Sequence, residues 1–230
     1  MVHPMTDSAT ASVTPQDVRQ TAEACRRALR PVADMDWDAP AGDLEWSCRT
    51  TLGHMLAALL YYAVNLALRS TEPRPSGQAD PSLPVAELLD ALEGRAGLLA
   101  TVCEAARPDA RGAHDWGLAD ASGFAALACD EMLVHTSDIT AGLGASFDPP
   151  RDVRARVLGR LFPWAPPNRD SWEALRWANG RGPMGERLRL APDWVAHPAP
   201  LQEWDGQDPQ MSPHDVTSSA TLGIDSGGGW

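Results

Sequence analysis

Two apolar segments of this sequence carry side chains that together could bind a metal ion. Glu131 and His135 are four residues apart, so on a helix their side chains lie one turn apart and can converge on one point. A third donor, His54, lies in an earlier apolar segment that we expect to face them. Two imidazoles and one carboxylate leave a coordination position open for water or a thiolate, as catalytic zinc sites require. Non-haem iron uses similar donors, so the residue types do not fix the metal.

Three further side chains are candidates for supporting roles. Asp138 follows His135 by three residues and could orient its imidazole from the far side of the ring. Arg49, in the first turn of a predicted helix, either contacts an anionic group of a ligand or is an ordinary surface arginine. Arg181 follows a predicted helix end at Asn179-Gly180, and a short loop there could clamp a carboxylate.

The spacing of Glu131 and His135 also has a simpler explanation. The chain contains six histidines and 31 acidic residues, so a carboxylate four positions from a histidine is expected by chance about once or twice. A buried histidine beside a glutamate is also often only a hydrogen-bonded pair in a protein core. Spacing alone therefore leaves two interpretations, a metal site and a core pair.

The four cysteines offer no better site. Cys25, Cys48, Cys103 and Cys129 are scattered singly, without a CxxC pair. On the predicted helix Cys129 points away from the Glu131 face, and the other three are better explained as small core residues. The sequence also has no convincing Ser-His-Asp or Cys-His arrangement, GxGxxG motif or phosphate-binding loop. This argues against a protein nucleophile and against nucleotide chemistry.

Four helices are expected to position the candidate residues, because four segments combine apolar patterning with helix-start residues. They cover residues 14–32, 47–70, 85–106 and 122–141. The second has no charged residue between Arg49 and Arg69. One of its faces is an apolar stripe, and His54 lies on the opposite face among small, polar and aromatic residues, which suits the lining of a cavity. The stripe consists of Leu52, Leu56, Leu59, Ala63 and Leu66.

The composition divides the chain into four parts, and the expected fold class is mainly α. These parts are a flexible N-terminus (1–13), a metal-binding four-helix bundle (14–146), a C-terminal extension packed on the bundle (147–205) and a disordered tail (206–230). The extension is short, rich in proline and mostly helical. It should contain helices over 151–162 and 171–180 and a strand over 186–190.

The net charge of −12 argues against nucleic acids and anionic membranes as partners, since both favour clustered basic residues. The longest apolar stretch, Leu52–Leu68, is interrupted by polar residues and is shorter than the roughly 20 residues of a membrane span. No secretory signal precedes the first helix, so we expect a cytoplasmic protein with reduced thiols. All 19 basic residues are arginine, which together with abundant alanine and proline indicates a GC-rich genome, such as that of an actinobacterium.

Two segments carry a resemblance to a known family. Residues 43–59, DLEWSCRTTLGHMLAAL, resemble the start of the metal-binding bundle in the mycothiol-dependent maleylpyruvate isomerase N-terminal family, part of the DinB-like superfamily. Residues 129–144, CDEMLVHTSDITAGLG, are similar to the second signature of that family, E-x-x-x-H followed by Asp. Segments 175–181 and 200–206 are similar to those of actinobacterial members, so the resemblance covers most of residues 15–205. The matching residues are Trp46, Ser47, Arg49 and His54 in the first signature and Glu131, His135 and Asp138 in the second.

The resemblance implies a DinB-like four-helix bundle in which His54, Glu131 and His135 bind a divalent cation, usually zinc, with Fe²⁺ and Ni²⁺ as alternatives. It also implies mycothiol as a low-molecular-weight thiol cosubstrate and a small electrophilic metabolite as substrate. Metal coordination lowers the pKa of a thiol and supplies a thiolate at neutral pH, which adds to an electrophilic carbon. The implied activity is that of a thiol transferase or isomerase. Because the part after the bundle is short, maleylpyruvate itself is not specifically indicated as the substrate.

Other functions are compatible with the same scaffold. The bundle could bind a small molecule or a metal without turnover, or carry a vestigial site with a structural or regulatory role. Metal-dependent hydrolysis by a zinc-bound water would use the same ligands. The sequence identifies neither the substrate nor the oligomeric state, and a homodimer is one expectation because bundles with exposed apolar helix faces often dimerise.

Overall fold

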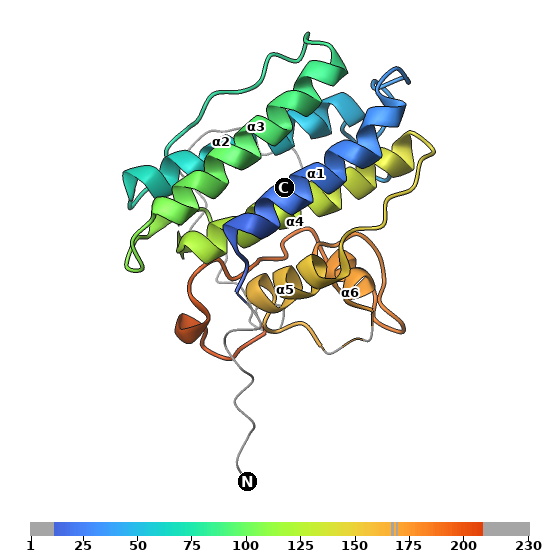
Figure 1. Ribbon diagram of the computed structural model, residues 1–230. Coiled ribbons are helices and arrows are strands. Elements are labelled where there is room, and N and C mark those ends of the chain that lie inside the picture. The colour runs from blue at the N-terminus through green and yellow to red at the C-terminus, as the bar shows by residue number, and fades with distance from the viewer. Residues whose placement is uncertain (1–11, 167, 169, 209–230) are drawn as a thin grey trace, which may run out of the picture.

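The chain folds mainly into α-helices, as expected from the sequence (Figure 1). The computed structural model describes residues 12–166, 168 and 170–208. Within this part, six α-helices, two short 3₁₀ helices and one two-stranded hairpin follow one another. Their bounds are α1 Pro15–Leu29, η1 Arg30–Val32, α2 Cys48–Leu68, α3 Val85–Ala105, β1 Gly112–His114, β2 Gly117–Ala119, α4 Ala121–Gly142, α5 Arg151–Leu161, α6 Ser171–Ala178 and η2 Leu201–Glu203.

Four long helices, α1 to α4, run side by side and enclose most of the core (Figure 1). α1 and α2 each pack against both α3 and α4. The predicted apolar stripe of α2 is buried along its whole length, from Leu52 to Leu66. Burial of each such leucine stabilises the fold by about 1.5–3 kcal/mol, so the rotation of α2 about its own axis is strongly determined. The face that carries His54 is determined with it.

Helices α2 and α4 are antiparallel. The start of α2 meets the end of α4, where Cys48 Sγ lies 3.7 Å from the carbonyl oxygen of Ile139. Near the other end of the pair, the rings of Tyr62 and Phe124 have centroids 5.7 Å apart. This arrangement places His54, near the start of α2, beside the second half of α4.

Side chains at the helix starts fix where the helices begin. Thr14 and Asp17 form a reciprocal capping box at the start of α1, and the hydroxyl of Ser47 caps α2. Thr14 and Ser47 are the residues at which the first two predicted helices begin. At the start of α4, Asp120 accepts a hydrogen bond from the N–H of Gly123 at 2.7 Å. Each cap satisfies a backbone donor that the first helical turn leaves unpaired.

Part of the C-terminal extension is joined to the start of α4. Helix α5 packs against α4 and α6 packs against α5, on the side away from α2 and α3 (Figure 1). The buried guanidinium of Arg160 donates to Asp120 Oδ1 at 2.7 Å and to the carbonyl oxygens of His197 and Pro198. Asp120 therefore caps α4 and holds the extension with the same carboxylate.

The β-hairpin between α3 and α4 is absent from the sequence-based expectations. Its strands pair antiparallel, with Gly112 opposite Ala119 and His114 opposite Gly117. Strands of three residues are too short to show an alternating pattern in the sequence. Gly112 packs directly on α2, since a Cβ atom there would lie 2.6 Å from the carbonyl oxygen of Asn65. The hairpin therefore covers the end of α2.

Two predictions outside the main helices require correction. The predicted strand over 186–190 does not form; the structure has only an isolated bridge between Met184 and Arg187, and Leu188 is 84% exposed. Without a neighbouring strand, an alternating pattern alone does not stabilise an extended segment. At the other end, Val13 belongs to the core rather than to a flexible terminus, and its N–H donates to Ser122 Oγ. Residues 1–11 of the predicted terminus and residues 209–230 of the predicted tail lie outside the described residues.

Helix α2 is also the one helix in the described part of the chain that is long and apolar enough to span a membrane. That property rests on length and composition alone. Buried core helices commonly share it, and 56% of the apolar window of α2 is buried inside the structure. We therefore describe α2 as a core helix.

Candidate metal centre

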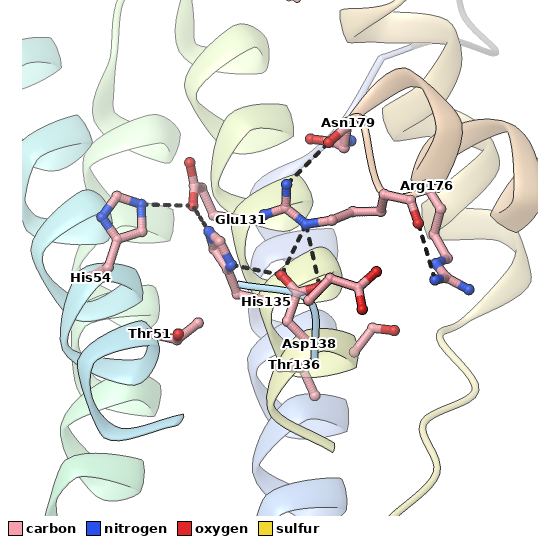
Figure 2. Close-up of polar contacts among 12 residues, drawn as sticks. Thr51, His54, Glu131, His135, Thr136, Asp138, Arg176 and Asn179 are labelled. Atoms are coloured by element: carbon pink, nitrogen blue, oxygen red, sulfur yellow. Dashed lines mark hydrogen bonds and ion pairs between the residues drawn. The ribbon is translucent and has the colours of Figure 1, made fainter. Parts of the chain in front are cut away.

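The three predicted donors come together between α2 and α4 (Figure 2). His54 Nε2 lies 3.2 Å from Glu131 Oε2, and His135 Nε2 lies 3.3 Å from the same oxygen. One donor atom from each of the three residues lies within 4.8 Å of the other two. This group could hold a metal ion.

The antiparallel helix pair explains the convergence. Glu131 and His135 project from consecutive turns of α4, so both side chains point to the same side of that helix. His54 faces them from α2, because the opposite stripe of α2 is buried against the other helices. The side chain of His135 is only 4% exposed, whereas those of His54 and Glu131 are 16% and 20% exposed. An external ligand would therefore approach from the side of His54 and Glu131.

The charges of the group suit a cation. Burial acts to raise the pKa of Glu131, but the adjacent imidazoles of His54 and His135 outweigh it and hold this pKa well below its usual value. The carboxylate is therefore ionised. Among the described residues, Glu131 Oε2 accepts no hydrogen bond of normal geometry, although it is shielded from solvent. An ionised buried oxygen needs compensation, and a cation shared with two imidazole nitrogens would supply it.

Asp138 lies where the sequence places it, on the far side of His135. Its Oδ2 is 3.0 Å from His135 Nδ1, so Nε2 of the ring is directed toward Glu131 (Figure 2). Burial acts to lower the pKa of His135, but the hydrogen bond with Asp138 and the contact with Glu131 raise it to about 9. In the metal-free protein Asp138 thus stabilises the imidazolium, and in the neutral ring it fixes the proton on Nδ1.

Arg181 contacts Asp138, and through it supports the site. Its Nε donates to both carboxylate oxygens of Asp138, at 3.3 and 3.1 Å, and one terminal nitrogen donates to the carbonyl oxygen of Asn179. The sequence suggests that a short loop at this position could clamp a carboxylate. In the structure, the carboxylate that Arg181 binds belongs to the chain itself.

Asp130 and Asn179 form a second link between α4 and the extension, which sequence reasoning misses. Asn179 Nδ2 donates to Asp130 Oδ1 at 3.0 Å, and both side chains are buried. Burial, together with the charge of Glu131, raises the pKa of Asp130 to about 8. A signal was present, because Asp130 directly precedes Glu131 on a helix most of whose residues are buried.

The structure gives Arg49 a role away from the metal donors. Its guanidinium donates to the carbonyl oxygens of Pro81 and Leu83, at 3.0 and 2.9 Å. These carbonyls belong to the linker before α3, so Arg49 holds that linker on the start of α2. This contact favours a structural interpretation of Arg49 over contact with a ligand.

Two aromatic side chains, Trp46 and Tyr62, lie beside the donors. The Trp46 ring lies 5.1 Å from the His54 ring and 6.5 Å from the His135 ring, between centroids. On another side, the Tyr62 hydroxyl donates to Glu131 Oε1 at 3.3 Å. The imidazoles and the carboxylate are thus held by neighbouring side chains.

The cysteines lie in the core, as predicted. All four are buried free thiols. The Cys129 sulfur accepts a hydrogen bond from Thr21 of α1, on the side of α4 away from Glu131. Burial raises the pKa of Cys25 to about 12 and that of Cys103 to about 12, so neither is a thiolate at neutral pH.

Replacing Asp138 by asparagine tests its control of His135. In the metal-free protein we expect the pKa of His135 to fall from about 9 by at least roughly one unit, because the variant loses a hydrogen-bonded negative charge. Titration of ¹⁵N-labelled imidazoles by NMR measures this directly. Asp109→Asn, at an exposed ion pair with Arg107, is the matched control and should leave His135 unchanged. An unchanged pKa in Asp138→Asn would show that Asp138 does not govern the ring.

Comparison with known proteins gives no further assignment. No protein-family model, no curated protein and no solved structure matches the chain. The interpretation of the site therefore depends on its residues and their geometry.

Proposed function

We propose that this protein is a metal-dependent thiol transferase or isomerase, with a divalent cation, by preference zinc, bound by His54, Glu131 and His135. The thiol would be a low-molecular-weight cosubstrate such as mycothiol, and the substrate a small electrophilic metabolite. The observation that carries the proposal is the convergence of two imidazole nitrogens on one ionised carboxylate oxygen. The packing of α1 to α4 supports the proposed DinB-like four-helix bundle.

The bound cation would lower the pKa of an external thiol and so favour the thiolate at neutral pH. The protein contributes the arrangement around it. Glu131 supplies negative charge, and Asp138 keeps His135 Nε2 directed toward the donors. Arg181 in turn holds Asp138. This leaves His54 and Glu131 at the more exposed side of the group, where a cosubstrate can enter.

The state of the cysteines supports an external thiol rather than one of the chain. All four are buried, and burial raises the pKa of each thiol above its usual value. A nucleophilic cysteine normally has a lowered pKa and access to its substrate. Thiol chemistry at this site therefore requires an external thiol cosubstrate.

The proposal predicts a product that depends on both metal and thiol. We expect zinc-loaded protein to accelerate the conjugation of mycothiol with an electrophile such as 1-chloro-2,4-dinitrobenzene or maleate, with the conjugate identified by mass spectrometry. Glutathione in place of mycothiol tests the choice of thiol. Metal-free protein and the His54→Ala variant are the controls. With either of them, the conjugation should proceed at the rate measured without protein.

The alternatives give different results in the same assay. Metal-dependent hydrolysis would consume an ester or amide substrate without added thiol, since a zinc-bound water can use the same three ligands. A binding protein would retain mycothiol or the electrophile in equilibrium dialysis without forming product. Equal rates with and without the loaded protein, over a panel of electrophiles, would contradict the proposed enzyme.

A further inference from the structure

Tyr62 contacts the metal-ligand candidate Glu131 on the oxygen that faces away from the histidines. Its hydroxyl donates to Glu131 Oε1 at 3.3 Å. The other carboxylate oxygen, Oε2, is the one that lies 3.2 Å from His54 Nε2 and 3.3 Å from His135 Nε2. The two oxygens of one carboxylate therefore have different partners, a tyrosine hydroxyl on one and two imidazoles on the other.

The position of the Tyr62 hydroxyl is fixed by its surroundings. The residue is 3% exposed, and its ring packs against Phe124 and His114, each with a centroid distance of 5.7 Å. The hydroxyl is thereby held in place with Glu131 Oε1 as its acceptor.

A carboxylate can bind a metal through one oxygen or through both, and hydrogen bonds to its oxygens select between these modes. A donor held at Oε1 competes with a cation for the lone pairs of that oxygen. It also restricts rotation of the carboxylate, because rotation toward bidentate binding would break the Tyr62 contact. With Oε1 engaged, the chain offers a cation three donor atoms, one each from His54, Glu131 and His135.

We propose that Tyr62 is a positioning residue. Its hydroxyl keeps Glu131 Oε1 hydrogen-bonded, so that the carboxylate binds the cation through Oε2 alone. This inference rests on the proposed metal function. If Glu131 binds through one oxygen only, one more coordination position of the cation stays available to an external thiolate. The residue acts through Glu131 and does not touch the cation or the substrate.

The chain provides a matched control, because its two tyrosines are neighbours on the same helix. The Tyr61 hydroxyl is buried but makes no hydrogen bond within the described part of the chain. Tyr61→Phe and Tyr62→Phe therefore remove the same atom from adjacent positions. Only the second removes a contact with Glu131.

The test uses Co²⁺ as a spectroscopic replacement for zinc in the full-length protein. We expect wild-type protein and Tyr61→Phe to share one visible spectrum. In Tyr62→Phe the visible bands should shift and weaken, because the second carboxylate oxygen joins the metal and raises its coordination number. Addition of 2-mercaptoethanol should produce a sulfur-to-cobalt charge-transfer band in wild type and Tyr61→Phe, with at least roughly tenfold weaker thiol binding in Tyr62→Phe.

The possible results separate this inference from the proposed function. Identical cobalt spectra for wild type and Tyr62→Phe would overturn the role of Tyr62 and leave the metal site standing. A changed spectrum in Tyr62→Phe, with no charge-transfer band in any protein, would support Tyr62 but contradict thiol binding. Failure of wild-type protein to bind Co²⁺ would overturn both.

A measurement on the wild-type protein alone guards against misfolding of Tyr62→Phe. X-ray absorption at the zinc edge distinguishes a carboxylate bound through one oxygen from one bound through two. One oxygen from Glu131 is the expected result, and bidentate binding in the wild-type protein would overturn the inference. Thermal unfolding followed by circular dichroism shows whether the variant is folded.

Discussion

We expect the metal content to fall from about one ion per chain to a trace when His54 and His135 are both replaced by alanine. The double variant retains only Glu131 of the three donors, and a single carboxylate does not hold zinc or iron at micromolar concentrations. Elemental analysis of purified protein, after reconstitution and removal of loosely bound ions, measures the change. This is the largest effect that we expect from any substitution at the site.

A histidine outside the site serves as the control. The His197 ring contacts the carbonyl oxygen of Pro200 in the extension, far along the chain from the donors. His197→Gln keeps a side-chain donor at this position and should retain the full metal content. Metal bound equally by wild type and by the double variant would place the ion elsewhere. Absence of metal from wild type, even after reconstitution, would contradict the proposed function and leave the three residues as a polar cluster in the core.

Gly142→Ala should destabilise the fold by about 3 kcal/mol or more. A Cβ atom at this position would clash with the carbonyl oxygen of Pro40 and would lie 3.0 Å from Cys48 Sγ and 3.1 Å from the Ala41 Cα. Backbone atoms supply two of these contacts, so a side-chain rotation cannot relieve the overlap. The end of α4 and the loop before α2 would have to separate. Urea unfolding of the metal-free protein measures the loss.

The control for this substitution lies in α3. A Cβ atom at Gly94 would meet no atom within 4 Å, so Gly94→Ala introduces no overlap. It should instead stabilise the protein by about 1 kcal/mol, because alanine loses less conformational freedom than glycine in a helix. If the two variants unfolded at the same urea concentration, close packing of the loop against α4 would not be the cause.

The helices could be predicted because their signals are local. Thr14 and Ser47 mark helix starts through caps that span only three residues, and the buried stripe of α2 repeats at helical spacing. The pairing of Glu131 with His135 is local for the same reason. No local sequence pattern shows that α2 and α4 are antiparallel neighbours. His54 was therefore grouped with Glu131 and His135 on two other grounds, the expectation that the two segments face each other and the family resemblance.

The contacts that could not be predicted connect residues distant in sequence. Tyr62 and Glu131 are 69 positions apart, and Arg181 and Asp138 are 43 positions apart. Arg181 was expected to bind a carboxylate, and it does so. The sequence alone could not show that this carboxylate is the side chain of Asp138. The predicted strand over 186–190 failed for a related reason, since an extended segment needs a partner strand that only the tertiary structure supplies.

The links from the extension to α4 make the candidate centre and the extension one thermodynamic unit. Arg181 and Asn179 reach α4 on either side of the donor pair, at Asp138 and at Asp130. A ligand that binds only when His135 is held in place must, by linkage, also favour the docked position of residues 179–181. Above the dissociation constant, each tenfold increase in ligand concentration adds about 1.4 kcal/mol to the free energy that favours the docked position. Loading the centre would therefore protect the α6 region from proteases, although the three candidate donors lie on α2 and α4.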